Sequence, residues 1–389
     1  GRLGKIKDQG IYGTCWAFAS LTAVETSLMP EEKYDFSEDN MVWNSGYFGA
    51  QYDGGDYTRA ISYLASWRGP VLEEDDVYGD GINNPDAGVV KHVQEAQIIE
   101  SKNLEAVKKA VFLYGGVESS LYTSMSYAGE RSMYYNDKNY SYCYIGTKKP
   151  NHDVVIIGWD DNYSKDNFST KPTNNGAWII RNSYGKAIEI SMEQLRKNNP
   201  GLEDEEIVNT FSASMNCNCT LSEDGQILSV SVGDNGIFYI SYEDSYIYSD
   251  LLGIENAEDK KDYDNLYQYD NLGGGEVGYI KGNDVKDIFL ANVFTRTKTD
   301  TEYLTSIGFQ SLVEGTYEVY INPNGTDKSL SNLQKAELTT GEEISLTAGY
   351  HTINFKKAYK LKENNFVVAI KMKHKDGGIS YFTYEAKEE

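Results

Sequence analysis

Apolar residues recur with helical spacing in the first third of the chain. Ala17, Leu21, Val24 and Leu28 are separated by four, three and four residues, which predicts one buried helical face over 14–29. Similar patterns, some of them with a serine or aspartate at the start, predict three more helices. One begins near Ser37, and the other two cover 56–67 and 103–114.

The hydrophobic period changes after residue 115. Short apolar runs bounded by turn residues predict buried strands at 116–121, 153–159, 177–182 and 236–242. Helices followed by strands indicate an α+β fold with a helical half and an antiparallel β half, which we place at 1–248. Residues 186–234 lie between the last two of these strands and form an insert. Within the insert, 203–215 is a predicted helix.

The last third of the chain predicts a second domain. Residues 249–262 are acidic and poorly patterned, so we interpret them as a linker. From 263 to 389, short alternating runs return at regular spacing between Gly, Asn and Asp residues, which predicts an all-β sandwich. The clearest runs are 288–294, 303–310, 316–321, 350–355 and 366–372.

The composition limits the classes of partner. The chain has 389 residues, with Lys+Arg 36 and Asp+Glu 59, and therefore a formal net charge of −23. This balance argues against nucleic acid and anionic membranes as partners, and it is typical of the solvated surface of a secreted protein. No transmembrane run and no signal peptide are visible, and we expect that residues upstream of Gly1 have been removed.

The chain has four cysteines, which are too few for a disulfide scaffold. Cys217 and Cys219 lack a second pair or a histidine cluster at zinc spacing, so we expect no structural zinc. Cys143 could form a disulfide with either of them. The remaining cysteine, Cys15, is the candidate for chemistry.

Cys15 stands where a nucleophile would be useful. Thr14 is a plausible N-cap, which places Cys15 in the first helical turn, where the helix dipole favours the nucleophilic thiolate. The alternative is that Cys15 is only a small core residue. A nucleophilic cysteine also needs a base and a group that orients the base. His152 opens the predicted strand 153–159, and Asn182 ends the neighbouring apolar run.

Four segments around these residues resemble the papain-like cysteine peptidases. Residues 9–18 resemble the oxyanion and nucleophile segment, 151–159 the histidine strand and 178–185 the asparagine segment. Residues 53–55 resemble the turn whose backbone pairs with the substrate. The segments lie in the family's order. His152 follows Cys15 by 137 residues, within the family's window of about 130–150, whereas Asn182 lies just past it at 167.

The resemblance implies a role for each matching residue. Cys15 would be the nucleophile, His152 the base and acid, and Asn182 the group that orients the imidazole. The Gln9 side chain and the Cys15 backbone N–H would stabilise the oxyanion. The reaction would be hydrolysis of peptide bonds through a thioester, and no cofactor would be required.

Further positions are implied to contact the substrate or to support the site. The substrate-binding candidates are Gly54, Gly55, Tyr57, Asn151 and Asp153. The supporting candidates are Trp16 and Tyr184. Tyr184 stands where the family usually has a tryptophan that shields the His–Asn bond. Asp153 stands where a small apolar residue is common, which leaves the preference of the S2 subsite open.

The second domain resembles the lectin-like domain of papain-like peptidases from Gram-positive, clostridia-like bacteria. That group includes cell-wall and surface-layer processing proteases. The resemblance rests on 263–270, 291–294 and 349–353. It implies a secreted or cell-wall associated monomer whose partners are a protein or peptide substrate and, in the second domain, a cell-wall or surface glycan. Calcium could bind in that domain, but no ligand set can be named.

Three alternatives remain open at this point. The protein could be a glycan-binding or wall-binding adhesin in which the peptidase fold is vestigial. It could also be a wall amidase that uses the same Cys–His pair. The insert 186–234 could be a surface elaboration, or it could border the cleft as a lid or exosite.

Overall fold

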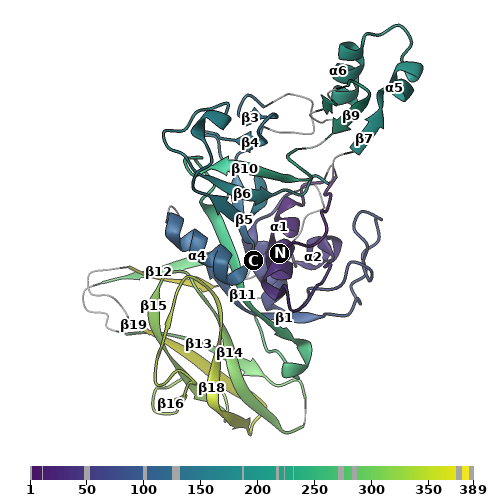
Figure 1. The fold of residues 1–389 in the computed structure, drawn as a ribbon. Coiled ribbons are helices and arrows are strands. Elements are labelled where there is room, and N and C mark those ends of the chain that lie inside the picture. Colours follow the sequence, from purple (N-terminus) through teal and green to yellow (C-terminus); the bar gives the residue numbers. More distant parts are fainter. Residues whose placement is uncertain are drawn as a thin grey trace.

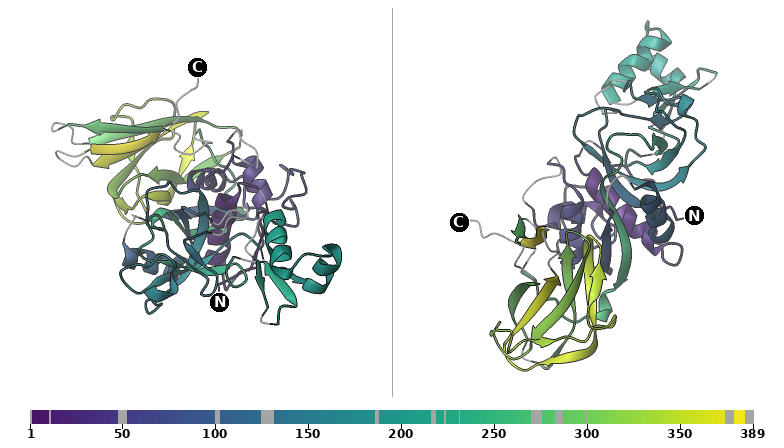
Figure 2. Two further views of the ribbon diagram at one scale, coloured as in Figure 1. Left: turned by 90° about the horizontal axis from the view of Figure 1, so that it is seen from above. Right: turned by 90° about the vertical axis from the view of Figure 1, so that its left-hand side faces the viewer.

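The computed structural model describes residues 2–10, 12–47, 53–99, 103–124, 132–185, 188–215, 219–222, 224–230, 232–269, 276–282, 287–298, 300–373 and 379–384. Helices dominate the first part of the chain and strands the rest, as predicted, but a strand at 91–98 that was not predicted precedes the fourth helix, and two further helices lie in the insert (Figure 1). The β-sandwich and the insert lie at opposite ends of the molecule, with the helices between them (Figure 2).

The four predicted helices of the first half are confirmed. They are α1 Cys15–Leu28, α2 Glu38–Asn44, α3 Tyr57–Ala65 and α4 Leu104–Tyr114. Ser37, Asp56 and Asn103 cap the last three, because each side chain accepts a hydrogen bond from a backbone N–H in the first turn. Thr14 precedes α1 but makes no such bond, since its hydroxyl pairs with the Tyr78 hydroxyl at 2.7 Å. The expected side-chain cap of α1 is therefore wrong.

Ten strands form one sheet that runs through the molecule, in the order β14-β18-β1-β11-β2-β5-β6-β10-β4-β3. The strands of the first half are β1 Lys91–Ile98, β2 Val117–Leu121, β3 Tyr135–Asn136, β4 Ser141–Tyr142, β5 His152–Asp160, β6 Ala177–Arg181, β10 Ile237–Ser241 and β11 Ser249–Asp259. The four predicted buried strands correspond to β2, β5, β6 and β10. Short 3-10 turns follow β5 and β11, at Lys165–Asn167 and Lys260–Asp262.

Two apolar cores hold the first half together. One joins α1, α2 and α3 to the face of β1 and β11, with Trp16, Leu21 and Met41 fully buried in it. The other joins α4 to β2, β5, β6 and β10 around Trp178 and Phe238. Because α1 packs against β5 and β11, its N-terminal end is held at the junction of the helical and β halves.

The predicted linker 249–262 is wrong. Residues 249–259 form β11, which pairs with both β1 and β2 in the middle of the large sheet. Leu251, Leu252 and Ile254 are buried, whereas the acidic side chains that obscured the pattern occupy less buried positions. One of these, Asp259, lies opposite Lys91 on β1 and forms an ion pair with it at 2.7 Å.

The second domain continues the sheet of the first. Strand β18 Gly349–Leu361 pairs with β1 over Glu95–Gln97, and β14 Glu302–Ser311 pairs with β18. Gly349 has a φ of +146°, and a Cβ atom there would lie 2.1 Å from the carbonyl oxygen of Ala96. Only glycine therefore allows β18 to approach β1 so closely. His351 is buried at this junction and lies 2.7 Å from Glu95.

The remaining strands complete the predicted β-sandwich. They are β12 Glu276–Lys281, β13 Asp287–Thr295, β15 Gly315–Asn322, β16 Gln334–Lys335, β17 Ile344–Leu346, β19 Asn365–Lys373 and β20 Ile379–Tyr384. β12 pairs with β20, while β13, β19, β15 and β16 form a second sheet to which β17 adds. All five predicted runs fall within strands of this domain. Its core includes Val319, Ile321 and Ile353.

The insert forms a small unit of its own. It contains β7 Ile188–Ser191, α5 Met192–Asn198, α6 Asp204–Met215, β8 Cys219–Leu221 and β9 Ile227–Val230. The strands form the separate sheet β7-β9-β8, and Met192, Leu195, Ile207 and Val208 form a separate core. The predicted helix 203–215 is confirmed as α6. In Figures 1 and 2 the unit projects from the end opposite the β-sandwich.

Candidate active site

Cys15 is the first residue of α1 and is nearly buried, with 9% of its surface exposed. Its Sγ atom lies 4.0 Å from Oδ2 of Asp153, which is the second residue of β5. The helix tip and the start of the strand therefore meet, and His152 is the residue that precedes Asp153 on that strand. The predicted nucleophile and the predicted base are thus brought to one region.

The environment of Cys15 favours the thiol. Burial, and then the negative charges of Asp153 and Glu118, raise the pKa of the Cys15 thiol to about 12. A helix dipole contributes only about 0.3–1 kcal/mol at an exposed site, less than one pKa unit. Burial and neighbouring negative charge therefore act against the helix dipole, which favours the thiolate.

His152 and Asn182 are joined by a direct hydrogen bond. Nε2 of His152 lies 2.8 Å from Oδ1 of Asn182, and the same oxygen accepts the backbone N–H of Ser183 at 2.9 Å. Because an amide oxygen only accepts, Nε2 must carry the proton and Nδ1 must carry the lone pair. Burial lowers the pKa of His152 to about 4, while the bond to Asn182 acts in the opposite direction. At neutral pH the imidazole is therefore neutral and can accept a proton at Nδ1.

Tyr184 covers the imidazole. Its ring stacks on the ring of His152 with the centroids 4.8 Å apart and an interplanar angle of 26°. Its hydroxyl lies 3.4 Å from Nδ1 of His152. An aromatic ring therefore lies against His152 at the position where the resemblance placed a shield, although the residue is a tyrosine.

Gln9 lies beside the asparagine segment. Its backbone N–H donates to the carbonyl oxygen of Ser183 at 2.8 Å, and its Oε1 accepts the Ser183 hydroxyl at 2.6 Å. Nε2 donates to the carbonyl oxygen of Tyr12 at 2.7 Å. These bonds fix the side chain of Gln9, which is buried, between the asparagine segment and the turn that leads to Cys15.

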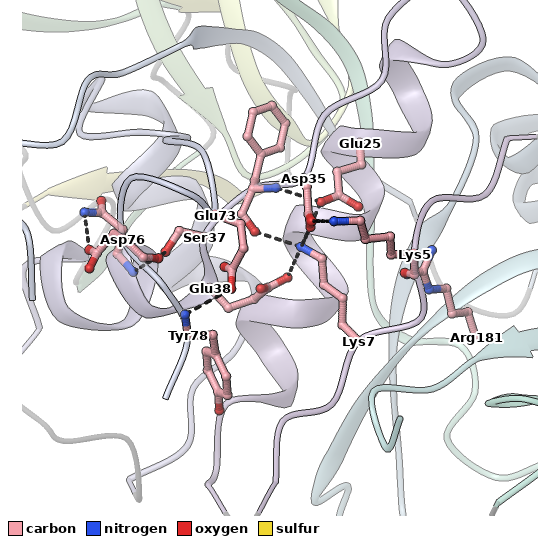
Figure 3. Close-up of polar contacts among 12 residues, drawn as sticks. Lys5, Lys7, Glu25, Asp35, Ser37, Glu38, Glu73, Asp76, Tyr78 and Arg181 are labelled. Carbon is pink, nitrogen blue, oxygen red and sulfur yellow. Dashed lines mark hydrogen bonds and ion pairs between the residues drawn. The ribbon is translucent and has the colours of Figure 1, made fainter. Parts of the chain in front are cut away.

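A buried lysine holds the segment that carries Gln9 (Figure 3). Nζ of Lys7 lies 2.9 Å from Glu25 on α1, 2.8 Å from Glu38 on α2 and 3.0 Å from Asp35, and it donates to the carbonyl oxygen of Phe36 at 2.7 Å. Burial lowers the pKa of Lys7, but the carboxylates together outweigh burial and raise it well above its usual value. Lys7 therefore stays charged and ties the N-terminal segment to both helices.

Both parts of the chain are similar to known protein families. Residues 1–209 match the model of the papain family of cysteine proteases, and 266–387 match the model of a lectin-like domain. The first match covers more than half of the chain. The chain belongs to the papain family. It is 28% identical over 185 residues to cysteine protease Amb a 11.0101 of Ambrosia artemisiifolia, which covers 46% of this chain and 44% of that protein. It is also 28% identical over 200 residues to cathepsin K of Gallus gallus, which covers 48% and 52%.

The chain therefore spans about half the length of these curated relatives. Two solved structures of the clostridial cysteine protease Cwp84 resemble this papain-family chain over its full length. Both have a TM-score of 0.73 and 25% identity, and 86% and 77% of their chains are covered. One is described as the cysteine protease and lectin-like domains of a surface layer associated protein of Clostridium difficile. The predicted fold class, a papain-like domain followed by a lectin-like domain, is thereby confirmed.

The predicted substrate turn lies against the residue next to Cys15. Gly54 has a φ of +70°, and a Cβ atom on Gly55 would lie 2.5 Å from the indole of Trp16. Trp16 is itself buried in the core of the helical half. The two glycines of this papain-family chain are therefore required by a left-handed turn and by close packing on Trp16.

The three other substrate-binding candidates have different environments. Tyr57 begins α3 and is half-buried, and burial and the charges of Asp250 and Asp56 raise its pKa. Asp153 is buried beside Cys15. Asn151 is exposed, and its side-chain amide makes two hydrogen bonds, of 2.7 and 2.9 Å, with the backbone of Thr123. Its geometry is that of a residue that fixes the loop after β2.

Cys143 is a free, buried thiol that packs with Phe168 and Ala177. It does not form the disulfide that we had considered. Cys217 lies outside the described residues, as does the side chain of Cys219. In the part of the chain that the structure describes, no group of three or more His, Cys, Asp and Glu residues could hold a metal ion. None of the described helices is long and apolar enough to span a membrane.

Proposed function

We propose that the protein is a cysteine endopeptidase that hydrolyses peptide bonds of proteins. The observation that carries the proposal is the hydrogen bond between His152 and Asn182. His152 begins β5, and the following residue of that strand, Asp153, contacts Cys15. Membership of the papain family supports this activity, and the alternative of an adhesin with a vestigial peptidase fold is not favoured.

The first chemical step transfers a proton from sulfur to nitrogen. Cys15 is a neutral thiol and His152 a neutral imidazole with its lone pair on Nδ1. We assign Nδ1 as the base that accepts the thiol proton while the sulfur attacks the peptide carbonyl. The imidazolium then donates that proton to the leaving amine, and a thioester remains on Cys15. A water then attacks the thioester carbonyl and gives a proton to His152, which passes it to the departing sulfur. The carboxylic acid product leaves, and the Cys15 thiol and the neutral His152 are restored.

Asn182 and Gln9 support these steps from two sides. Oδ1 of Asn182 holds the ring of His152 in one orientation and stabilises the imidazolium. Nε2 of Gln9 carries two hydrogens, one of which is donated to Tyr12. We assign the second hydrogen, together with the backbone N–H of Cys15, to the oxyanion of the tetrahedral intermediate.

An irreversible thiol-directed inhibitor tests the assignment of the nucleophile. Incubation with an epoxysuccinyl inhibitor should add one molecule to the protein, and peptide mapping by mass spectrometry should place it on Cys15. Cys143 should stay unlabelled because it is fully buried in an apolar cluster. Labelling mainly at Cys143, Cys217 or Cys219, or hydrolysis that persists after stoichiometric labelling of Cys15, would contradict the proposal.

We further propose that the protein is secreted or cell-wall associated in a Gram-positive bacterium. The similarity to a surface layer associated protein and the net charge of −23 support this location. The match of residues 266–387 to a lectin-like domain supports a cell-wall or surface glycan as a second partner. Between α3 and the β-sandwich lies a cavity of about 1210 Å³, lined in part by Tyr263, Tyr267 and Tyr269, where such a ligand could bind.

We propose that the insert is a surface elaboration and not a lid. Its ends are adjacent, because a Cβ atom on Gly236 would lie 3.3 Å from the carbonyl oxygen of Gly185. Replacing residues 186–234 by two glycines is therefore expected to give a folded protein. Its kcat/KM for a short peptide and for a folded protein substrate should both match those of the full chain. Slower cleavage of the folded substrate alone would identify an exosite.

A further inference from the structure

Two carboxylates are buried along the first turns of α1, and one of them, Asp153, contacts Cys15. Asp153 contacts the Sγ atom at 4.0 Å and accepts the Ser120 hydroxyl at 2.5 Å through its other oxygen. Ser120 lies opposite Asp153 in the pairing of β2 with β5. Glu118 lies two residues before Ser120 on β2, so its side chain is on the same face of the sheet. Burial, and then the charge of Asp153, raise the pKa of Glu118 well above its usual value.

Glu118 is not fully satisfied by the protein. It is 1% exposed, and its Oε2 accepts the Ser20 hydroxyl of α1 at 2.5 Å. Its Oε1 is buried and has no hydrogen-bond partner within the described part of the chain. A buried carboxylate oxygen without a partner costs free energy, roughly 1–3 kcal/mol or more for a charged group. Such an atom, on the sheet face where Asp153 contacts the nucleophile, indicates a ligand that donates to it.

Two more carboxylates stand where the cluster reaches the surface. Asp250 is exposed at a bulge of β11 opposite β2, with a φ of +53°, and Asp56 is exposed at the start of α3. Their charges act on Asp153, whose pKa burial and these neighbours raise to about 7. Acidic groups therefore extend from the exposed Asp56 and Asp250 to the buried Glu118 and Asp153. We call Asp56, Glu118, Asp153 and Asp250 the carboxylate cluster.

The carboxylate cluster contrasts with the other acidic site of this half. Around Lys7, buried carboxylates are neutralised by a lysine of the same chain. No lysine or arginine among the described residues forms an ion pair with a member of the carboxylate cluster, and no metal-binding group of three was found there. When the cluster is ionised, the described part of the chain therefore offers it no cation, which leaves a ligand as the source of one.

We propose that the carboxylate cluster is a subsite that binds the lysine or arginine side chain of the substrate at P2, the second residue before the scissile bond. Tyr57 and Asp153, two of the residues predicted to contact the substrate, lie at the cluster. A long side chain with a terminal positive charge suits a site that has carboxylates both at the surface and at buried positions. The inference rests on the proposed peptidase function and specifies the class of peptide that the site cleaves.

Matched peptides that differ only at P2 test this proposal. Arginine and citrulline have nearly the same shape, but only arginine is charged. The wild-type kcat/KM should be about 10–100-fold higher for the arginine peptide, the range expected for charge-assisted hydrogen bonds. The ratio should rise between pH 5 and pH 8, because Asp153 has a pKa of about 7 and attracts a cation only when ionised. Ionisation of Glu118, whose pKa is also raised, acts in the same direction, whereas Tyr57 and Cys15, whose pKa values are raised too, remain uncharged over this range.

Two substitutions locate the preference in the cluster. Glu118→Gln keeps the shape of the side chain, and Asp250→Asn suits the positive φ, which asparagine tolerates. Glu118→Gln should reduce the arginine-to-citrulline ratio about tenfold, because a bound guanidinium favours the ionised form of Glu118, which glutamine cannot provide. Asp250→Asn should reduce the ratio about threefold, because that residue is exposed. The control is Glu105→Gln on α4, whose side chain is 83% exposed, and it should leave the ratio unchanged.

The outcomes separate this inference from the proposed function. Equal cleavage of the arginine and citrulline peptides, or a charge preference at another position, would overturn the subsite. If no peptide were cleaved, the same peptides would be titrated calorimetrically into the Cys15→Ala variant. Tighter binding of the arginine peptide would then support the subsite while the peptidase proposal failed, and equal affinities would overturn the subsite as well.

Discussion

Substituting Cys15 by alanine is expected to lower kcat for peptide hydrolysis by at least about 10⁴-fold, because no thioester can form without the nucleophile. The measurement is the initial rate on a fluorogenic peptide, followed at enzyme concentrations high enough to detect the residual activity. Stability should change little, because only one sulfur atom at a partly accessible helix tip is lost. The thermal midpoint measured in parallel would confirm this.

Cys143 offers the matched control for this variant. It is also a free thiol, and its pKa is also raised to about 12 by burial and the charge of Asp244. It lies, however, in the cluster with Phe168 and Ala177 and not at the start of a helix. Cys143→Ala should keep the wild-type kcat while it loses some stability to the cavity. A Cys15→Ala variant that retains more than a hundredth of the wild-type rate would contradict the assigned nucleophile.

The elements that position the site could be predicted because their patterns are local. The apolar face of α1 and the runs of β5 and β6 place Cys15, His152 and Asn182 at element ends, whatever the rest of the chain does. β11 could not be predicted in this way. Its acidic side chains are accommodated by long-range partners such as Lys91, which is 168 residues away in the chain. The acidic composition of 249–262 indicated a linker, whereas pairing with β1 and β2 places residues 249–259 in a central strand.

The chemistry of the site was less predictable than its location. The thiolate expected from the helix N-terminus depends on a local field, but the pKa of Cys15 is set by burial and by Asp153 on another element. Glu118 was visible only as part of an apolar strand run. Its alternation with Ser120 indicates a polar face of β2, but only the register with β5 shows that this face meets Asp153 and Cys15. The carboxylate cluster is therefore a product of the fold.

Substituting Lys7 by methionine is expected to destabilise the protein by about 3–5 kcal/mol, the second large effect. Methionine fills the space of the aliphatic chain but leaves Glu25 and Glu38, each 1% exposed, without their cation. Chemical denaturation would measure the loss. The loss of stability should be smaller at pH 5 than at pH 8. Without the lysine, burial raises the pKa of these carboxyl groups in the folded protein above their unfolded values, so the protein becomes less stable as the pH rises and they ionise. Burial already raises the pKa of Glu38 to about 8.

The neighbouring Lys5 provides the control for Lys7. It pairs with Asp35 at 2.8 Å, but its side chain is 80% exposed, so Lys5→Met should leave the free energy of unfolding nearly unchanged. Equal effects of the two substitutions would show that the burial of the Lys7 network carries no special weight.

If Lys7→Met behaves as expected, activity should be lost together with local protection of Gln9 in hydrogen exchange. Lys7 binds α1 and α2 to the segment from which Gln9 reaches the asparagine segment, so the buried ion-pair network would position the oxyanion donor without touching the substrate.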